Sequence, residues 1–382
     1  MSLAEVKHQG HAQRVLQRAL IGGRVPHAYL FHGPDGVGKE LLARGLGQLL
    51  LCPRPITVRP AAADVEAVGL EQLQVGCGTC ADCRAVAGDV HPDLHLIHRY
   101  LYRDHPESKV RNRKGLELII DVVRHFLIER VGLTPMRGRA KVFIIREADL
   151  MNAHAQNALL KTLEEPPGAT FLILLTCNVD LLLPTTQSRC QPVRFDALPR
   201  EFIAERLRSL APDLSEPARD WYARSAEGSL GRAMEAVDDK LFELNERVVA
   251  PLARWPADRE AVSAQRWLDE AKALGENYRT RDPDISDSEA TRRGLTAVLR
   301  LVAAWYADLL LLATGGDGDS LINGLLLPLL QNSAARFSPT TAIRAITRVG
   351  DAERHLNQNV NAQLCVDALL IALAGKWPTP RR

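Results

Sequence analysis

The chain is 382 residues long, which predicts two to three domains of ordinary size. Hydrophobic residues make up 46% and charged residues 25%, as in soluble globular proteins, so the composition excludes a collagen-like, mucin-like or disordered chain. The formal net charge of +2 excludes a globally basic surface, and any contact with nucleic acid must therefore come from local patches.

The sequence favours a cytoplasmic protein. Its first ten residues, MSLAEVKHQG, lack the apolar core of a signal peptide. The most apolar segment, Leu295–Gly315, contains Arg300 and Asp308, and charges at the centre of a bilayer are costly, so we expect a buried helix there. In a cytoplasmic chain, seven cysteines indicate metal ligands or core thiols rather than disulfides.

Strand-like and helical patterns alternate along the first half of the chain. Residues 27–33, HAYLFHG, predict a strand that leads into a glycine-rich loop, and residues 39–51 predict the helix that follows. Lys141–Ala148 and Thr170–Asn178 are near-continuous apolar runs, as strands buried on both faces require. This alternation predicts an α/β fold with a parallel sheet and crossover helices.

A helix is expected between the last two strands, within Asp149–Gly168. Alanine, leucine and lysine in its body favour helix, and the sequence Pro-Pro-Gly ends it. Asp149 is the expected N-cap.

From Phe202 onward the pattern is helical, without convincing strands. We therefore expect three domains: an α/β domain over residues 1–196, a small helical domain over 197–245 and a helical C-terminal domain over 246–382.

The segment FHGPDGVGKE contains a phosphate-binding frame, in which Gly33, Gly38 and Lys39 match the pattern Gly-x4-Gly-Lys and Gly36 lies between them. A working loop cradles phosphates with backbone N–H groups, places a lysine on the terminal phosphates and holds magnesium with a Ser or Thr hydroxyl. Glu40 stands at the hydroxyl position, where its carboxylate repels a polyanion. A glycine-rich turn with no nucleotide is the alternative interpretation.

The second magnesium position is also altered. The strand that begins at Lys141 should be followed by an aspartate that orients magnesium and a glutamate that positions water, but it is followed by Arg146 and Glu147. A cation therefore replaces a metal ligand. Because metal positioning carries much of phosphoryl-transfer catalysis, we expect no ATP hydrolysis, and whether a nucleotide is still bound stays open.

Three cysteines, Cys77, Cys80 and Cys83, have the Cys-x2-Cys-x2-Cys spacing that brings thiolates to one metal ion. Cys52 is the expected fourth ligand of a closed, structural zinc site within residues 50–90, although the long gap before Cys77 leaves His91 as a substitute. Three reduced thiols near a turn are the alternative. The other cysteines are expected to be buried thiols: Cys177, Cys190 and Cys365.

The segment Arg99–Gly115, RYLYRDHPESKVRNRKG, is locally basic and contains two tyrosines. Contact with a phosphate backbone or a partner protein is one interpretation, but Asp104 and Glu107 dilute the charge and favour a solvated loop. Residues 376–382 are expected to form a frayed tail.

Several motifs occur in a specific order. The sequence NALLKTLEEPP at Asn157–Pro167 precedes a buried strand and then Ser-Arg-Cys at residues 188–190. RVPHAYLFHGPDGVGK lies upstream at Arg24–Lys39, and GSLGRAM lies downstream at Gly228–Met234. Together these motifs resemble the clamp-loader subunits of the AAA+ class as far as Met234. Beyond that residue only the helical character matches.

Within that class, the altered magnesium site is similar to that of the delta-prime subunits of the bacterial DNA polymerase III clamp loader. The resemblance implies an AAA+ core with a four-cysteine zinc module, a helical lid and a helical collar domain. It also implies a subunit of the polymerase holoenzyme that does not hydrolyse ATP. Such a subunit completes a ring with the gamma/tau ATPase subunits and the delta subunit, and the ring loads the sliding clamp onto primed DNA.

The same resemblance implies roles for three residues. Arg189 of Ser-Arg-Cys corresponds to an arginine finger that reaches the ATP of a neighbouring subunit, and the alternative is a surface arginine that caps a carbonyl or makes a weak ion pair. Thr176 and Arg232 correspond to nucleotide-sensing positions. Their alternatives are a hydrogen bond at a strand end and a solvated helix residue.

Two other functions are kept as alternatives. The first is an active ATPase motor subunit of the same ring, against which Glu40 and Arg146 speak. The second is a zinc-braced DNA-repair ATPase, against which the sequence at Asn157–Pro167 speaks.

Overall fold

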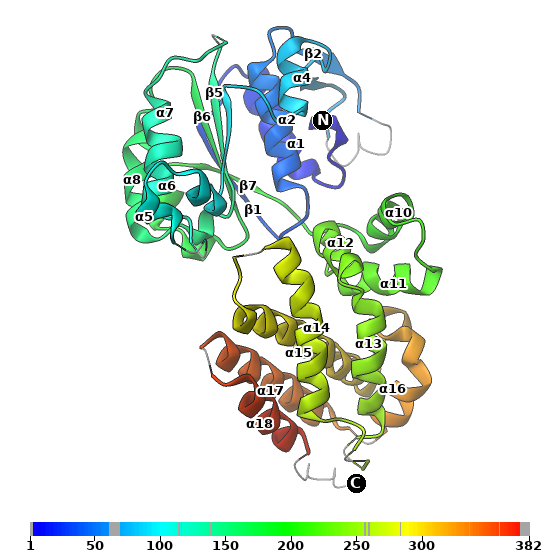
Figure 1. Ribbon diagram of the computed structural model, residues 1–382. Coiled ribbons are helices and arrows are strands. Elements are labelled where there is room, and N and C mark those ends of the chain that lie inside the picture. The colour runs from blue at the N-terminus through cyan, green and yellow to red at the C-terminus, as the bar shows by residue number, and fades with distance from the viewer. Residues whose placement is uncertain are drawn as a thin grey trace. The chain divides into compact units, whose positions relative to one another are not determined.

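The computed structural model describes residues 3–60, 69–113, 115, 117–137, 139–255, 257–258, 260–282, 284–335, 337–358 and 360–374 (Figure 1). The middle of the long gap before Cys77 and the expected C-terminal tail lie outside these ranges. The chain divides into two compact units, Met1–Pro199 and Arg200–Arg382, and each is described by itself.

The first unit is built on a five-stranded parallel sheet with the strand order β4-β5-β6-β1-β7. The strands are β1 Ala28–His32, β4 Leu94–Ile97, β5 Lys141–Ile145, β6 Thr170–Thr176 and β7 Gln191–Arg194. Because all the strands run in one direction, their C-terminal ends lie at one edge of the sheet and their N-terminal ends at the opposite edge. The predicted α/β fold with a parallel sheet is confirmed.

The three predicted strands are the buried centre of the sheet. Every residue of β5 is buried, as are nearly all residues of β1 and β6. The two edge strands were not predicted. β4 is only four residues long and mostly half-buried, and β7 contains Pro192 and buries only Val193. Short edge strands with polar side chains carry little periodic signal.

Helices cover both faces of the sheet (Figure 1). The helices of the first unit are α1 Gly10–Ile21, α2 Lys39–Leu51, α4 Ala81–Ala87, α5 Ser108–Arg111, α6 Ile120–Val123, α7 Glu129–Val131, α8 Ala153–Glu164 and α9 Pro184–Gln187. A π-helical turn, η3 Arg124–Ile128, joins α6 to α7, and short 3-10 turns occur at η1 Leu3–Glu5, η2 Arg99–Asp104, η4 Ala148–Leu150 and η5 Val179–Leu181. The α6–η3–α7 helix and α8 lie on one face, and α1 and α2 lie on the other.

The helix between β5 and β6 begins later than the sequence predicts. Asp149 lies in the 3-10 turn η4, so its predicted role as N-cap is wrong. The cap of α8 is Asn152, whose Oδ1 accepts a hydrogen bond from the Ala155 amide at 3.0 Å. The end of the helix at Glu164, just before the Pro-Pro-Gly sequence, agrees with the prediction.

An insertion after α2 contains the antiparallel hairpin β2 Ile56–Val58 and β3 Leu73–Val75, followed by α4. Two glutamines attach it to the α/β core. Gln17 of α1 exchanges two hydrogen bonds of 2.8 Å with the backbone of Gln74 in β3, and Gln48 of α2 donates to the Cys83 carbonyl at 3.1 Å. Buried amide side chains with satisfied partners hold such an insertion in one orientation.

The second unit contains only helices among its described residues, as predicted. They are α10 Arg200–Leu210, α11 Glu216–Ser225, α12 Leu230–Asp238, α13 Leu241–Val249, α14 Ala264–Arg281, α15 Asp287–Ala313, α16 Leu327–Ala334, α17 Pro339–Asn357 and α18 Ala362–Ala374. Short 3-10 turns occur at η6 Ala250–Ala253, η7 Gly318–Ser320 and η8 Gly324–Leu326. The long helix α15 packs against α13, α14, α16 and α17.

The helix α15 is long and apolar enough to cross a membrane, but half of its most apolar window is buried inside the second unit. Its Trp305 and Leu309 are fully or almost fully buried, as expected of a core helix. Asp308 is buried as well, and its carboxylate accepts hydrogen bonds from the Ile322 and Asn323 amides at 2.9 and 2.8 Å. These bonds satisfy the charge inside the protein.

A buried polar network crosses the boundary predicted between residues 245 and 246. The Asn323 Oδ1 accepts hydrogen bonds from Asn245 at 2.8 Å and from Trp221 at 3.4 Å, while the Asn323 Nδ2 donates to Asp308 at 2.8 Å. The same boundary falls inside α13. The division of the helical half into a lid and a C-terminal domain stays a prediction.

Two glycines let α14 and α15 approach closely. A Cβ atom at Gly294 of α15 would lie 2.1 Å from the Ala271 carbonyl oxygen of α14. A Cβ at Gly275 of α14 would lie 3.0 Å from the backbone of Ala290 in α15. The helix pair therefore depends on the absence of side chains at these two positions.

We expect Gly294→Ala to destabilise the second unit by about 1–3 kcal/mol, because the added methyl group overpacks the crossing of α14 and α15. The matched control is Gly350→Ala in α17, where a Cβ meets no atom within 4 Å, and there alanine should be neutral or stabilise the helix by up to about 1 kcal/mol. All five tryptophans lie beyond residue 200, so urea unfolding followed by tryptophan fluorescence reports on this unit. Equal midpoints for the two variants would contradict the close packing.

Candidate functional site

The glycine-rich loop joins β1 to α2, as predicted. Gly33, Gly36 and Gly38 have φ angles of 145°, 65° and 101°, in the region that favours glycine. At Gly33 a Cβ atom would also lie 2.3 Å from the Phe195 carbonyl oxygen. The loop therefore keeps the backbone shape of a phosphate-binding loop at the C-terminal edge of the sheet.

Lys39 is bound to the loop itself. Its buried side chain donates hydrogen bonds from Nζ to the carbonyl oxygens of Gly33 at 2.7 Å and Pro34 at 2.5 Å. The Nζ also lies 3.6 Å from the Cys177 Sγ. A phosphate group would have to replace these backbone carbonyls as the partner of the ammonium group.

Glu40 and Arg146, the two residues predicted to stand at the magnesium positions, bind each other. The Arg146 Nη2 donates to the Glu40 Oε1, and the Arg44 Nε donates to the same oxygen at 2.7 Å. Burial raises the pKa of Glu40, but the hydrogen bonds from Arg146 and Arg44 outweigh it and hold the pKa below its ordinary value. The carboxylate is thus ionised at neutral pH and is paired with two guanidinium groups.

Glu147, at the position expected to orient the attacking water, is held in an ion pair. It has a left-handed φ of 49°, and the Arg99 Nε lies 3.3 Å from its Oε2. Burial raises the pKa of this carboxyl, and Arg99 opposes that shift. The glutamate is therefore turned toward an arginine of the segment after β4.

The two predicted nucleotide-sensing residues make local contacts. Thr176, at the C-terminal end of β6, has a hydroxyl that donates to the Asn178 carbonyl at 2.9 Å and accepts from the Asn178 amide at 3.1 Å. Arg232 lies in the second unit, where its Nη1 donates to the Glu227 Oε2 at 2.8 Å. Their sensing roles stay predictions.

Arg189 lies just before β7, and therefore at the edge of the sheet opposite to the glycine-rich loop. Its Nε donates to the Glu164 Oε1 at 2.7 Å, its Nη2 donates to the same oxygen, and its Nη1 donates to the Thr185 carbonyl at 2.9 Å. The side chain is 32% exposed. Topology thus separates Arg189 from the phosphate loop of its own chain.

The four predicted cysteine ligands come together in the insertion. The sulfur atoms of Cys52, Cys77, Cys80 and Cys83 all lie within 4.8 Å of one another, and the Cys52–Cys80 and Cys77–Cys83 sulfur distances are 4.0 and 3.9 Å. Tetrahedral bonds of about 2.3 Å to zinc require sulfur atoms roughly 3.8 Å apart. The geometry therefore fits a zinc ion held by four thiolates.

Backbone amides surround the sulfur atoms. The amide of Cys77 donates to the Cys52 Sγ at 3.4 Å, that of Cys80 to the Cys77 Sγ at 3.4 Å, and that of Cys83 to the Cys80 Sγ at 3.3 Å. The amides of Cys80 and Thr79 lower the pKa of Cys77 to about 6. Cys77 is thus a thiolate at neutral pH, which favours metal binding.

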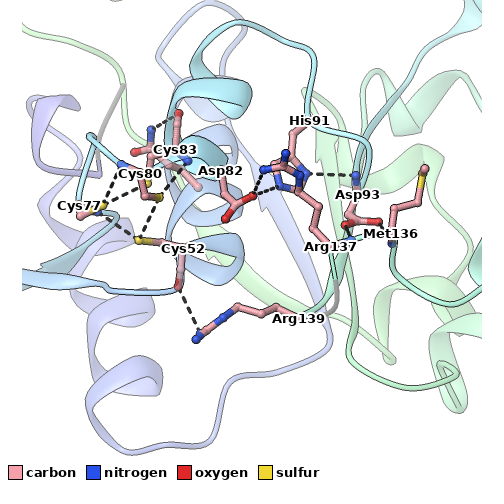
Figure 2. A network of polar contacts seen from close by, with 11 residues as sticks. Cys52, Cys77, Cys80, Asp82, Cys83, His91, Asp93, Met136, Arg137 and Arg139 are labelled. Carbon is pink, nitrogen blue, oxygen red and sulfur yellow. Dashed lines mark hydrogen bonds and ion pairs between the residues drawn. The ribbon is translucent and has the colours of Figure 1, made fainter.

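His91 is not part of this cluster. Its Nδ1 accepts a hydrogen bond from the Asp93 amide at 3.1 Å, and its Nε2 lies 3.4 Å from the Asp82 Oδ1 (Figure 2). The cysteine module is also attached to the loop before β5, because Arg137 binds Asp82 at 2.7 Å and Arg139 donates to the Cys52 carbonyl at 3.3 Å. Among the described residues, Cys52 rather than His91 completes the cluster.

Two other predictions need correction. Cys177 is exposed rather than buried, whereas Cys190 and Cys365 are buried as predicted. In the basic segment after β4, Arg99–Asp104 form η2 and Ser108–Arg111 form α5, and these turns bury Tyr102 and Val110, so the predicted loop is wrong there. Most of the charged side chains of the segment are exposed, in agreement with a solvated surface. The guanidinium groups of Arg99 and Arg103 lie 4.7 and 5.0 Å from the ring centre of Tyr100, so aromatic stacking orders the charges. 

Several functional contacts were not foreseen from the sequence. The Arg44–Glu40 pair had a readable signal, since residues four apart on a helix are neighbours. The Arg99–Glu147 and Arg189–Glu164 pairs had none, because each joins segments far apart in the chain.

A family model and several known proteins are similar to this chain. The family model described as "DNA polymerase III, delta subunit" matches residues 8–199, which is half of this chain. DNA polymerase III subunit tau of Escherichia coli is 34% identical over 244 residues, which cover 63% of this chain and 33% of tau. The chain thus spans only about a third of the length of this relative.

Two relatives are named DNA polymerase III subunit delta'. The one from Pseudomonas aeruginosa is 38% identical over 172 residues, 44% of each chain, and the one from Bacillus subtilis is 25% identical over 372 residues, 96% of each chain. A solved gamma subunit-related protein of Thermotoga maritima aligns over 94% of this chain and 98% of its own at 16% identity, with a TM-score of 0.45. The chain belongs to the DNA polymerase III delta-subunit family, and the resemblance to the delta-prime clamp-loader subunits is confirmed.

Proposed function

We propose that this protein is a clamp-loader subunit of DNA polymerase III that does not hydrolyse ATP itself. Its partners are the gamma/tau ATPase subunits and the delta subunit, and the assembled ring loads the sliding clamp onto primed DNA. Family membership and the relatives named tau and delta' support this role. The protein contributes structure and one arginine to hydrolysis that takes place on a neighbouring subunit.

The observation that carries the proposal is the ion pair between Glu40 and Arg146. A working site uses these two positions to hold magnesium, which bridges and neutralises the phosphates. Here the two side chains neutralise each other, and Arg44 adds a second positive partner to Glu40. Glu40 would have to leave both arginines to bind magnesium, and the positive charge of Arg146 repels a metal ion, so this pairing does not favour metal-assisted phosphoryl transfer.

The position of Arg189 supports a role on another chain. Its own phosphate loop follows β1 at the C-terminal edge of the sheet, whereas Arg189 precedes β7 at the N-terminal edge. At that edge the guanidinium group is available to a nucleotide that a neighbouring subunit presents. There it would neutralise the charge that develops on the transferring phosphoryl group, as arginine fingers do.

The four-cysteine cluster supports a structural zinc site held by Cys52, Cys77, Cys80 and Cys83. Four thiolates leave no open position on the metal, so the ion would fold and brace the insertion rather than take part in chemistry. Through Arg139 and the Asp82–Arg137 pair, the brace reaches the segment that leads into β5.

The isolated chain should hydrolyse ATP no faster than its Lys39→Ala variant in the presence of magnesium, because the metal positions are taken by Glu40 and Arg146. A coupled phosphate-release assay on both proteins makes the comparison. Magnesium-dependent turnover that exceeds the Lys39→Ala background would support the active-motor alternative instead.

Arg189→Ala should lower hydrolysis at the neighbouring subunit's site by about a thousandfold, since an arginine finger contributes at least that factor where it has been measured. The test is ATP hydrolysis and clamp loading by the reconstituted ring. Arg194→Ala is the matched control, because Arg194 is an exposed arginine of the same unit that pairs with Asp196. If both variants load the clamp at the rate of the unmodified ring, Arg189 is not the finger.

Metal analysis of the purified protein should find about one zinc ion per chain. Cys83→Ser should lose the ion and loosen the insertion, because three thiolates no longer close a tetrahedral site. Cys177→Ser is the control, since Cys177 lies outside the cluster, and it should keep its zinc. Zinc retained by Cys83→Ser would remove this site from the proposal.

A further inference from the structure

The guanidinium group of Arg189 is held by two segments, the end of α8 and the short helix α9. Glu164, the last residue of α8, accepts the hydrogen bonds from Nε and Nη2 through the same atom, Oε1. The Thr185 carbonyl in α9 accepts one bond from Nη1 at 2.9 Å. The arginine is thus fixed between the end of one helix and the turn of another.

The bonds to Glu164 and Thr185 do not use every N–H group of Arg189. An arginine has five N–H groups, one on Nε and two on each terminal nitrogen. The bonds to Glu164 and Thr185 use the Nε hydrogen and one hydrogen on each terminal nitrogen. Among the contacts of the described residues, one N–H on Nη1 and one on Nη2 remain available to donate to the oxygens of a phosphate group.

The location of the group agrees with this use. Glu164 and Arg189 precede β6 and β7, so both lie at the N-terminal edge of the sheet, away from the glycine-rich loop. The Arg189 side chain is 32% exposed and that of Glu164 is 48% exposed. The pair is accessible to a partner, and the weak strength of exposed ion pairs lets the arginine adjust when a phosphate arrives.

We propose that Glu164 is a positioning residue that orients Arg189 for a phosphate group of a neighbouring chain. The inference rests on the proposed role of Arg189 in hydrolysis on another subunit. Glu164 does not touch the nucleotide. It restricts the rotamers of a long side chain before the partner binds, and this lowers the entropy lost when the phosphate contact forms.

Two variants of Glu164 can separate its effect on the orientation of Arg189 from the effect of its negative charge. Because one oxygen of Glu164 accepts both bonds, the amide oxygen of a glutamine can accept the same two. Glu164→Gln therefore keeps the orientation and removes the negative charge, whereas Glu164→Ala removes both. The adjacent Glu165, which is exposed and outside the contact, provides the matched control Glu165→Ala.

The experiment compares these variants in the ring reconstituted with its ATPase subunits, the clamp and primed DNA. Glu164→Ala should lower kcat for ATP about two- to fivefold with little change in KM, as expected for an exposed pair. Glu164→Gln and Glu165→Ala should stay close to the unmodified ring. Thermal unfolding of each isolated variant checks that the first unit remains folded.

A double-mutant cycle with Arg189→Ala makes the test specific. Glu164→Ala should cause no further loss once Arg189 is absent, because nothing remains to be positioned. If Arg189→Ala lowers hydrolysis but Glu164→Ala matches Glu165→Ala, the positioning role is overturned and the finger stands. If Arg189→Ala has no effect, both proposals fall. Should the alanine variant not assemble, Glu164→Met replaces it, with a side chain of similar length and no oxygen acceptor, and the same outcomes apply.

Discussion

The direction of the strands in the parallel sheet is the constraint on which the other features of the first unit depend. Because β1, β4, β5, β6 and β7 run the same way, everything that follows a strand gathers at one edge and everything that precedes a strand gathers at the other. The glycine-rich loop, Arg146 and Thr176 follow strands, whereas Arg189 precedes one. The sheet thus separates the glycine-rich loop from Arg189.

The ion pair at the glycine-rich loop stabilises the two positions at which the sequence predicts an altered magnesium site. A half-buried charge without any partner would be costly at either position. Together, Glu40 and Arg146 satisfy each other, and Arg44 shares the same carboxylate oxygen. The loop also remains packed, since Gly33 contacts the backbone of Phe195 and Lys39 binds the loop carbonyls. The loop is therefore stabilised by contacts within the protein.

The cysteine module and the Glu164–Arg189 pair each hold side chains in a defined position, but they use different contacts. In the module, residues from α2, the β3–α4 turn and α4 hold their sulfur atoms at distances that suit zinc, and Gln48 and Arg139 connect the module to the core. At the opposite edge, an exposed carboxylate and a backbone carbonyl hold a guanidinium group. In both places, the residues that contact these side chains determine where the sulfur atoms and the guanidinium group lie.

The sequence by itself determined the central strands, the glycine-rich loop, the cysteine spacing and the helical second half, because each depends on local periodicity or on residues close together in the chain. Only the tertiary structure decided that Arg146 forms an ion pair with Glu40, which is 106 residues away in the chain, and that Cys52 rather than His91 completes the cysteine cluster. It also decided the edge strands β4 and β7 and the pairing of Arg189 with Glu164. These contacts join distant segments, and no local pattern records which distant segments the parallel sheet brings together.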